Sequence, residues 1–246
     1  MNKILVYTAV TGGYDSIKEI DNIENNIDYY CITDEHFKGE VPYPWKHIIL
    51  RNSKKDAKNL ARYCKMVPHR LFPNYDVSIW IDGNISIKGE ISMLLNDALK
   101  KGNIASYDHW GRNNIYQEFQ ECALIGHDFA WILDKQLKYY KDAGFESNSL
   151  FETNVLIRRH NDHNVKKTME LWLEHYDTFG KRDQYSFTFV CFKNNEHIVS
   201  LGRHDPRYIK KYFDYHGHLS TKRTIKLRMK RLLNLIYLRF NNKNFN

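Results

Sequence analysis

One short strand and the turn that follows it constrain the fold of this chain most. Residues 77–81 are an apolar, mostly β-branched run that stops abruptly at Asp82 and Asn84, which flank a glycine. Such a run, bounded by a turn signal, is typical of a buried strand. Polar groups at the carboxyl end of a buried strand lie where open α/β sheets bind ligands. The turn therefore offers two oxygen ligands for a hard cation, Mg²⁺ or Mn²⁺, although an ordinary Asx turn would give the same residues.

Short apolar runs alternate with amphipathic stretches on both sides of that strand. Further strands are expected over 3–10, 29–33, 47–50, 103–107, 155–158 and 198–201, and helices over 53–67, 91–100, 117–124, 129–143, 165–176 and from 182 onward. Ser53 is expected to cap the first helix with Asp56 as its capping-box partner, and Asp183 to cap the last. This alternation predicts an α/β fold.

The positive charge of the chain is concentrated at one end. The 246 residues carry a net charge of +8. Residues 220–246 contain eight Lys or Arg and no acid, so the rest is balanced, with 29 basic against 29 acidic residues. We therefore expect a neutral domain over 1–215 and a basic tail over 216–246. A nucleic-acid partner, the usual inference from a basic protein, would concern the tail only and is not expected.

The tail has the period of an amphipathic helix. Ile225, Met229, Leu232, Ile236 and Phe240 recur every three or four residues, and the basic side chains lie largely off that stripe. This pattern favours a helix lying on an anionic membrane surface through residues 220–240. A helix docked on the body and an RNA-binding arm are the alternatives.

Three further observations bear on the compartment. The cysteines are four and widely scattered, without metal or disulfide spacing, which favours a reducing cytoplasm. No apolar run is long enough to span a bilayer. The first residues turn polar too soon for a signal peptide. We expect a cytoplasmic protein, peripheral on the inner membrane face.

Four segments together resemble a known family. They are R-x-x-K-x-x-P-H-R-L-F-P-N over 62–74, S-I-W-I-D-G over 78–83, T-G-G-Y-D over 11–15 and R-D-Q-Y-S-F over 182–187. The pattern is similar to a glycosyltransferase-like family long filed as a domain of unknown function. Its members include plant mucilage galacturonosyltransferase-like proteins and bacterial polysaccharide-cluster proteins. The matches extend over most of the chain outside the tail.

The resemblance implies a GT-A fold, a Rossmann-like, mostly parallel mixed sheet flanked by helices. It also implies transfer of a sugar from a nucleotide-sugar donor, a UDP-sugar in particular. The acceptor would be lipid-linked or a polysaccharide, in capsule or O-antigen synthesis. Relatives often carry Lys where this chain has Asn84. Either Asp82, Asn84 and His204 bind a divalent cation, or Arg62 and Lys65 neutralise the diphosphate alone.

The same resemblance suggests roles for individual residues. The donor site would comprise Thr8, Gly13, Tyr14, Asp34, Arg62, Lys65, Asp82 and Gly83. His109, Arg112, Glu118 and Glu152 would hold the donor sugar or the acceptor. Asp183 would take the acceptor's proton if configuration inverts, with Glu152 as a second candidate base. Gln184 would stabilise the reacting carbon if configuration is retained. A hydrolase that acts on a lipid or glycan without nucleotide is the competing hypothesis.

Overall fold

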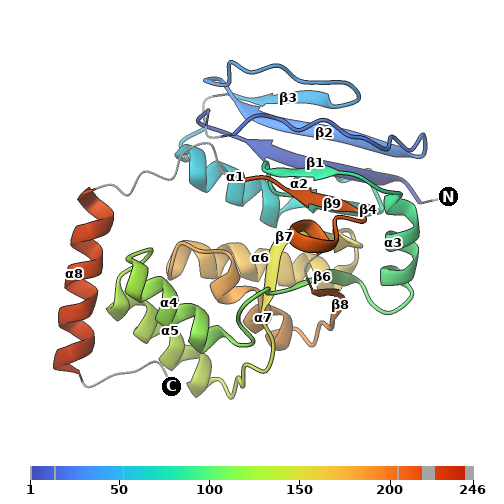
Figure 1. Ribbon diagram of the computed structural model, residues 1–246. Coiled ribbons are helices and arrows are strands. Elements are labelled where there is room, and N and C mark those ends of the chain that lie inside the picture. The colour runs from blue at the N-terminus through green and yellow to red at the C-terminus, as the bar shows by residue number, and fades with distance from the viewer. Residues whose placement is uncertain (1, 14, 52, 204, 218–224, 242–246) are drawn as a thin grey trace.

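A mixed seven-stranded sheet forms the centre of the molecule (Figure 1). The computed structural model describes residues 2–13, 15–51, 53–203, 205–217 and 225–241. The strand order is β3 (Lys46–Leu50), β2 (Ile27–Asp34), β1 (Ile4–Val10), β4 (Val77–Ile81), β7 (Phe151–Arg158), β6 (Ile104–Asp108) and β8 (Ile198–Arg203). Only β7 runs antiparallel to its neighbours. The expected GT-A architecture, a mostly parallel mixed sheet flanked by helices, is confirmed.

Helices and a small second sheet cover the two faces of this sheet. One face is covered by α1 (Ala57–Met66), α2 (Pro68–Leu71), α4 (Ile115–Ile125), α5 (Ala130–Asp142), α6 (His163–Thr178) and α7 (Gln184–Lys193). The other face is covered by α3 (Ile91–Leu99) and by the paired strands β5 (Ile85–Ile87) and β9 (Phe213–Tyr215).

The period of two along β1 explains why there are two hydrophobic cores. Leu5 and Tyr7 point into the core on the helix-rich face, whereas Val6 and Val10 point into the core beneath α3. Successive side chains of a strand alternate between faces, so a strand buried on both sides reads as a continuous apolar run. That is the run recognised in the sequence.

The reversed direction of β7 brings two distant segments together. Because β7 is antiparallel to β4, its first residues lie beside the carboxyl end of β4. The amide of Asp82 donates to the carbonyl of Asn154 at 2.9 Å. The polar residues that begin β7 therefore join the turn that follows β4, an arrangement that a fully parallel sheet would not produce.

Two predicted caps are wrong. The first helix begins at Ala57, and Asp56 itself is its cap, accepting from the amide of Asn59 at 2.8 Å. Ser53 lies in the preceding turn and accepts from the amide of Lys55 instead. Asp183 does precede α7, but its side chain makes no capping hydrogen bond because it faces other partners.

Other elements differ from expectation mainly in extent. The strand expected over 155–158 begins at Phe151, and the short elements α2, β5 and β9 were not foreseen. The tail helix α8 (Ile225–Phe240) is present and docks against α4 and α5. Within the described part of the chain, no helix is both long and apolar enough to cross a membrane.

Candidate functional site

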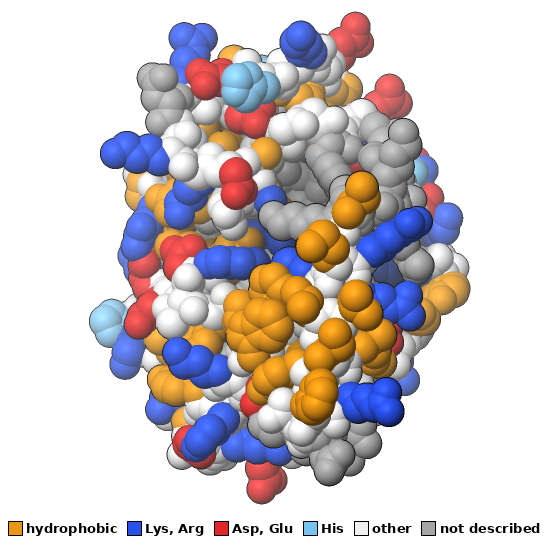
Figure 2. All heavy atoms as spheres, turned by 90° about the vertical axis from the view of Figure 1, so that its left-hand side faces the viewer, with side chains coloured by type: hydrophobic (Ala, Val, Ile, Leu, Met, Phe, Trp, Pro, Cys, Tyr) orange, Lys and Arg blue, Asp and Glu red, His pale blue; other side chains and the backbone are white. Residues whose placement is uncertain are grey.

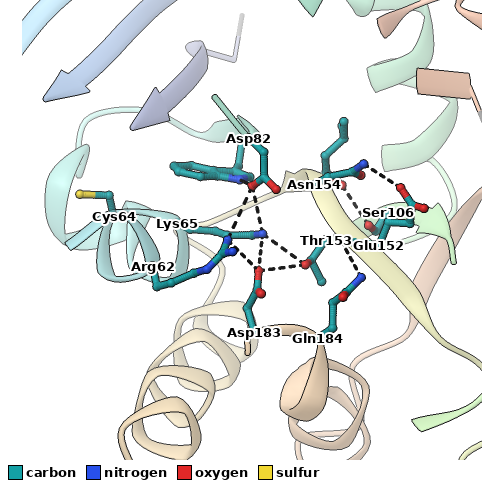
Figure 3. Close-up of polar contacts among 12 residues, drawn as sticks. Arg62, Cys64, Lys65, Asp82, Ser106, Glu152, Thr153, Asn154, Asp183 and Gln184 are labelled. Atoms are coloured by element: carbon teal, nitrogen blue, oxygen red, sulfur yellow. Dashed lines mark hydrogen bonds and ion pairs between the residues drawn. The ribbon is translucent and has the colours of Figure 1, made fainter. Parts of the chain in front are cut away.

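A buried lysine lies between two carboxylates at the carboxyl end of β4 (Figure 3). The Nζ atom of Lys65 lies 2.5 Å from Oδ2 of Asp183 and 3.2 Å from Oδ1 of Asp82. The lysine side chain is fully buried. An unpaired charge in such a place would be very costly, so the two carboxylates are what keep a lysine here.

Arg62 adds a second cation to this cluster. It lies one helical turn before Lys65 on α1, so both side chains leave the same face of the helix. Its guanidinium is 3.1 Å from Oδ2 of Asp183 and 3.9 Å from Oδ1 of Asp82. Two cations thus face two carboxylates, and the cluster as a whole is electrically balanced.

The surroundings of Asp183 hold its carboxyl group in the ionised form. Burial alone would raise its pKa, but the charges of Arg62 and Lys65, with the hydrogen bond from Lys65, bring that pKa below its ordinary value. A general base works best with a pKa near the working pH. Asp183 is therefore a weak proton acceptor and a strong anchor for the two cations.

Thr153 completes the cluster in a strained conformation. Its φ of 53° is left-handed, a region that β-branched residues rarely adopt. Its hydroxyl donates to Oδ2 of Asp183 at 3.1 Å and accepts from Lys65 at 3.2 Å. Strain of this kind costs about 1–3 kcal/mol and tends to occur at functional sites. Nothing in the residue type signals this, and the sequence interpretation missed it.

A second buried cluster surrounds Glu118. The Nε atoms of Arg112 and Arg182 lie 2.5 Å and 2.6 Å from its two carboxylate oxygens. Burial would raise the pKa of Glu118, but Arg182 and Arg112 together lower it. Burial also lowers the pKa of His109 to about 4, which keeps that imidazole neutral. Two arginines share one carboxylate here, so this cluster keeps an excess positive charge.

The segment Arg182-Asp183-Gln184 connects the two clusters. Arg182 reaches Glu118, whereas Asp183 reaches Lys65. Gln184 donates to the carbonyl of Glu152 at 3.1 Å and accepts from Nε of Arg182 at 2.9 Å. Arg182 was not predicted as a site residue, although it lies in the motif that pointed to its two neighbours.

Glu152 is held from the far side of the site. Its Oε1 lies 3.1 Å from Nε of Arg207, and its Oε2 accepts from the side-chain amide Nδ2 of Asn154 at 2.7 Å. The guanidinium of Arg207 lies 4.0 Å from the centre of the Tyr215 ring. Arg207 belongs to no recognisable motif, so the residue pattern does not single it out.

The residues expected to bind the nucleoside lie at the ends of β1 and β2. Asp34 accepts from the amide of Gly12 at 2.7 Å and so holds the two-glycine turn. Gly13 has a φ of 63° and open space where a Cβ would be. Thr8 is buried in β1. Tyr14 lies outside the described residues, as does His204.

The turn after β4 lies against the end of β1. A Cβ on Gly83 would lie 3.0 Å from the Val10 side chain, so only a small residue fits there. The parallel strands β1 and β4 thus end at one edge, next to the turn held by Asp34. Gly83, Gly13 and Asp34 all belong to this edge.

The described residues do not form a cage for a divalent cation. Oδ1 of Asp82 already accepts from Lys65 and from the indole of Trp80 at 2.7 Å. The side-chain amide of Asn84 is buried and donates to the carbonyl of His216 at 2.8 Å. No group of three His, Cys, Asp or Glu side chains in the described ranges could hold a metal ion. We therefore derive no step through a metal.

The chain is similar to known proteins over most of its length. The family model described as TOD1/MUCI70, glycosyltransferase-like domain, matches residues 1–203. A curated protein of Arabidopsis thaliana, the probable hexosyltransferase MUCI70, is 26% identical over 214 residues. The match covers 76% of this chain and 37% of that protein. The chain thus spans little more than a third of the curated relative's length.

Solved structures show only distant likeness. Mouse xyloside xylosyltransferase 1 is 10% identical with a TM-score of 0.47, over 81% of this chain and 84% of that one. The galactosyltransferase LgtC is 12% identical with a TM-score of 0.47, over 94% and 83%. The fold is defined here by the strand order and the single antiparallel strand.

Proposed function

This chain belongs to the TOD1/MUCI70 glycosyltransferase-like domain family, and we propose that it transfers a hexose from a nucleotide-sugar donor, a UDP-sugar, to a glycan acceptor. The observation that carries the proposal is the convergence of Lys65, Asp82 and Asp183 at the carboxyl end of β4. Ligands of open α/β sheets bind at such strand ends. The three residues come from separate parts of the chain and meet only in the folded molecule.

The donor would lie across the ends of β1, β2 and β4. We propose that the nucleoside lies near Thr8 and Asp34, on the turn that includes Gly12 and Gly13. The contribution expected of Tyr14 stays a prediction, because Tyr14 lies outside the described residues. The diphosphate would then reach Gly83, whose lack of a side chain leaves the backbone accessible. A surface hollow of about 490 Å³, lined by residues that include Arg70 and Glu170, lies elsewhere. It contains none of these groups, so we do not propose it as the donor site.

The reaction needs positive charge beside the leaving diphosphate, because negative charge grows on that group as the bond to the sugar breaks. Arg62 and Lys65 are balanced by two carboxylates, so they position groups rather than supply net positive charge. The excess charge of Arg112 and Arg182 over Glu118 is one source of positive charge among the described residues. A requirement for a divalent cation, Mn²⁺ or Mg²⁺, is proposed from the family resemblance alone, because the described residues form no cage for one, and no step is routed through it.

Asp183 is proposed as a positioning residue. Its lowered pKa makes it a poor base, and its carboxylate holds Lys65 and Arg62 at the strand end. Gln184 is proposed to lie nearest the sugar, with its amide oriented by Arg182 and by the carbonyl of Glu152. His109 and Glu118 would line the sugar or acceptor side.

The acceptor is proposed to be lipid-linked or a polysaccharide, in the assembly of a cell-surface glycan such as capsule or O-antigen. A cytoplasmic location on the inner membrane face would suit such an acceptor. Both proposals rest on the family resemblance and on the basic tail.

Release of UDP from a panel of UDP-sugars tests the proposal. We expect turnover with at least one sugar, and a loss of about 100-fold or more in Asp82→Asn, the range typical for lost transition-state stabilisation. Asp21→Asn is the matched control, because the side chain of Asp21 also pairs with a lysine, Lys88, but is half exposed and contacts no described residue of the proposed site. Addition of EDTA, followed by Mn²⁺ or Mg²⁺, decides the cation requirement.

The outcomes separate the two functions. Intact donors with every sugar, and no thermal shift with UDP, would contradict a glycosyltransferase. Turnover of a glycan or lipid without any nucleotide would establish the competing hydrolase. Equal activity in Asp82→Asn and the wild type would show that the active site does not lie at the end of β4.

A further inference from the structure

The tail helix α8 is docked on the body in one fixed orientation. Asn234 is fully buried, and its amide donates to the carbonyls of Ala123 and Asp128 while its oxygen accepts from the amide of Ala130. It therefore ties the end of α4 to the start of α5. The hydroxyl of Tyr237 adds a hydrogen bond to Asp134 at 3.0 Å. One side of α8 is thus packed against and hydrogen-bonded to the body.

The glycine at the end of α4 shows how close this contact is. A Cβ on Gly126 would lie 2.6 Å from the carbonyl of Leu227 and 3.0 Å from the amide of Arg231. The backbone of α8 therefore rests directly on the α4–α5 turn. A helix held this closely cannot roll to bury its other side.

The apolar stripe of α8 consequently faces away from the protein. The exposed fractions are 77% for Ile225, 61% for Met229, 60% for Leu232, 44% for Ile236 and 85% for Phe240. Figure 2 shows hydrophobic side chains gathered on this face of the molecule, with Lys and Arg at their margin. The apolar stripe recognised in the sequence is therefore not the side that docks. For a helix packed on the body, one would expect the apolar side to face the body.

The charged side chains of α8 itself all have one sign. Arg228 and Arg239 are exposed, and helical spacing places both along one side of the stripe. The sequence from 216 to 246 contains no acidic residue. A second copy of the chain would bring two such basic faces together, which like charges disfavour. An anionic lipid surface satisfies both the apolar stripe and the flanking arginines.

We propose that the outward face of α8, defined by Ile225, Met229, Leu232, Ile236 and Phe240 with its flanking arginines, lies on an anionic membrane surface. The apolar side chains would enter the headgroup boundary while the arginines meet lipid phosphates. In this arrangement α8 would hold the protein on the membrane in one orientation, because Asn234 fixes the helix to the α4–α5 turn.

The outward face of α8 lies on the side of the molecule to which the proposed donor site also opens. In Figure 1, β1 begins beside the N-terminus and runs towards the side on which α8 stands. The carboxyl ends of the parallel strands and the outward face of α8 are therefore directed to the same side of the molecule. The proposed donor site and the proposed membrane face would both be presented to one surface. The membrane inference itself needs no donor and does not depend on the proposed function.

Sedimentation of the full chain with vesicles tests the proposal. We expect binding to vesicles of phosphatidylcholine mixed with phosphatidylglycerol, little binding to phosphatidylcholine alone, and weakening by salt. Met229→Ser/Leu232→Ser/Ile236→Ser should lower the partition coefficient by about tenfold or more. Arg228→Gln/Arg239→Gln should lower it by about fivefold for each charge removed.

Matched variants on other faces control for hydrophobicity and charge. Tyr43→Ser/Met93→Ser removes side chains that are 83% and 56% exposed. Lys38→Gln/Lys101→Gln removes two exposed cations elsewhere. Both should leave vesicle binding unchanged, and the thermal midpoints of all variants should match the wild type.

Three results would overturn the proposal. One is equal binding to neutral and anionic vesicles, or none to either. Another is a concentration-dependent dimer that the serine variant abolishes, which would assign the face to a second copy. The third is tight, salt-sensitive RNA binding lost in the arginine variant but kept in the serine variant, which would make α8 a nucleic-acid arm.

Discussion

At the scale of single residues, Lys65 determines how this site is organised. A fully buried lysine between Asp82 and Asp183 links the end of β4 to the start of α7. Arg62 and the strained Thr153 add contacts to the same carboxylate of Asp183. The cost of burying these charges is offset only while all partners are present, so the cluster should respond strongly to the loss of any one.

A double-mutant cycle tests that coupling. Lys65→Met or Asp183→Asn alone should lower the free energy of unfolding by about 3–5 kcal/mol, since each leaves a buried charge short of its partner. The double variant should lose less than the sum of the two, by about 2 kcal/mol or more. Urea unfolding of the four proteins measures the cycle.

An exposed pair with the same separation is the control for this cycle. Lys138 and Asp142 also lie 2.5 Å apart, but their side chains are 76% and 62% exposed. The cycle of Lys138→Met and Asp142→Asn should give a coupling of only about 0.3–0.5 kcal/mol. Similar couplings for the two pairs would contradict the account of a buried cluster.

Buried histidines should make the fold sensitive to mild acid. Burial lowers the pKa of His160 and of His175 to about 4. Below pH 6.5 the unfolded chain takes up protons that the folded chain does not, so stability falls as pH drops from about 7 to 5. We expect a loss of about 1–2 kcal/mol for each histidine, measured by urea unfolding at both pH values.

Replacement of one histidine measures its contribution to the pH dependence of stability. His175→Phe should reduce the loss between these pH values by the contribution of His175, about 1–2 kcal/mol. The aromatic side chains of Tyr140 and Phe189 beside this position should accommodate the new ring. His36→Phe, at a site where the side chain is 79% exposed, should leave the slope unchanged. An unaltered slope in His175→Phe would contradict this, because it would mean that His175 takes up its proton equally in the folded and unfolded chain.

At the scale of elements, the period of apolar residues predicts that a helix or strand forms. It does not predict in which direction that element runs or which side it buries. The apolar run of β4 and the stripe of α8 were both recognised, and both form the expected elements. The reversal of β7 was not, because an apolar run reads the same whether a buried strand is parallel or antiparallel. That reversal is what places Glu152 and Thr153 beside Asp82.

The same limit applies to α8. The stripe indicated an amphipathic helix but not which side would face the body. The deciding residue is Asn234, a polar side chain whose three hydrogen bonds to the backbone depend on where two other helices end. Such a partnership leaves no periodic signal in the sequence.

Two glycines at helix ends test the docking of α8. Gly126 and Gly144 end α4 and α5 with φ values of 79° and 75°. Gly144→Ala should cost only the backbone strain, about 1 kcal/mol, because nothing lies within 4 Å of the new Cβ. Gly126→Ala should cost clearly more, because its Cβ would meet the backbone of α8. Thermal unfolding compares the two, and equal losses would contradict the close docking.

At the scale of the whole molecule, the sheet edge collects residues that are far apart in the chain. Arg62, Asp82 and Asp183 were singled out from motifs, and the fold brings them together. Arg207 and Thr153 join the site through tertiary placement and backbone strain, which no residue pattern reveals. The roles assigned to His204 and Tyr14 remain predictions, because both residues lie outside the described part of the chain.

A crystal structure of the chain with UDP and Mn²⁺ would locate the donor. We expect uracil near Thr8 and Asp34, and the diphosphate against Gly83 and Asp82 at the end of β4. UDP bound in the hollow beside Arg70 and Glu170, or at any place away from the carboxyl ends of β1 and β4, would contradict this expectation.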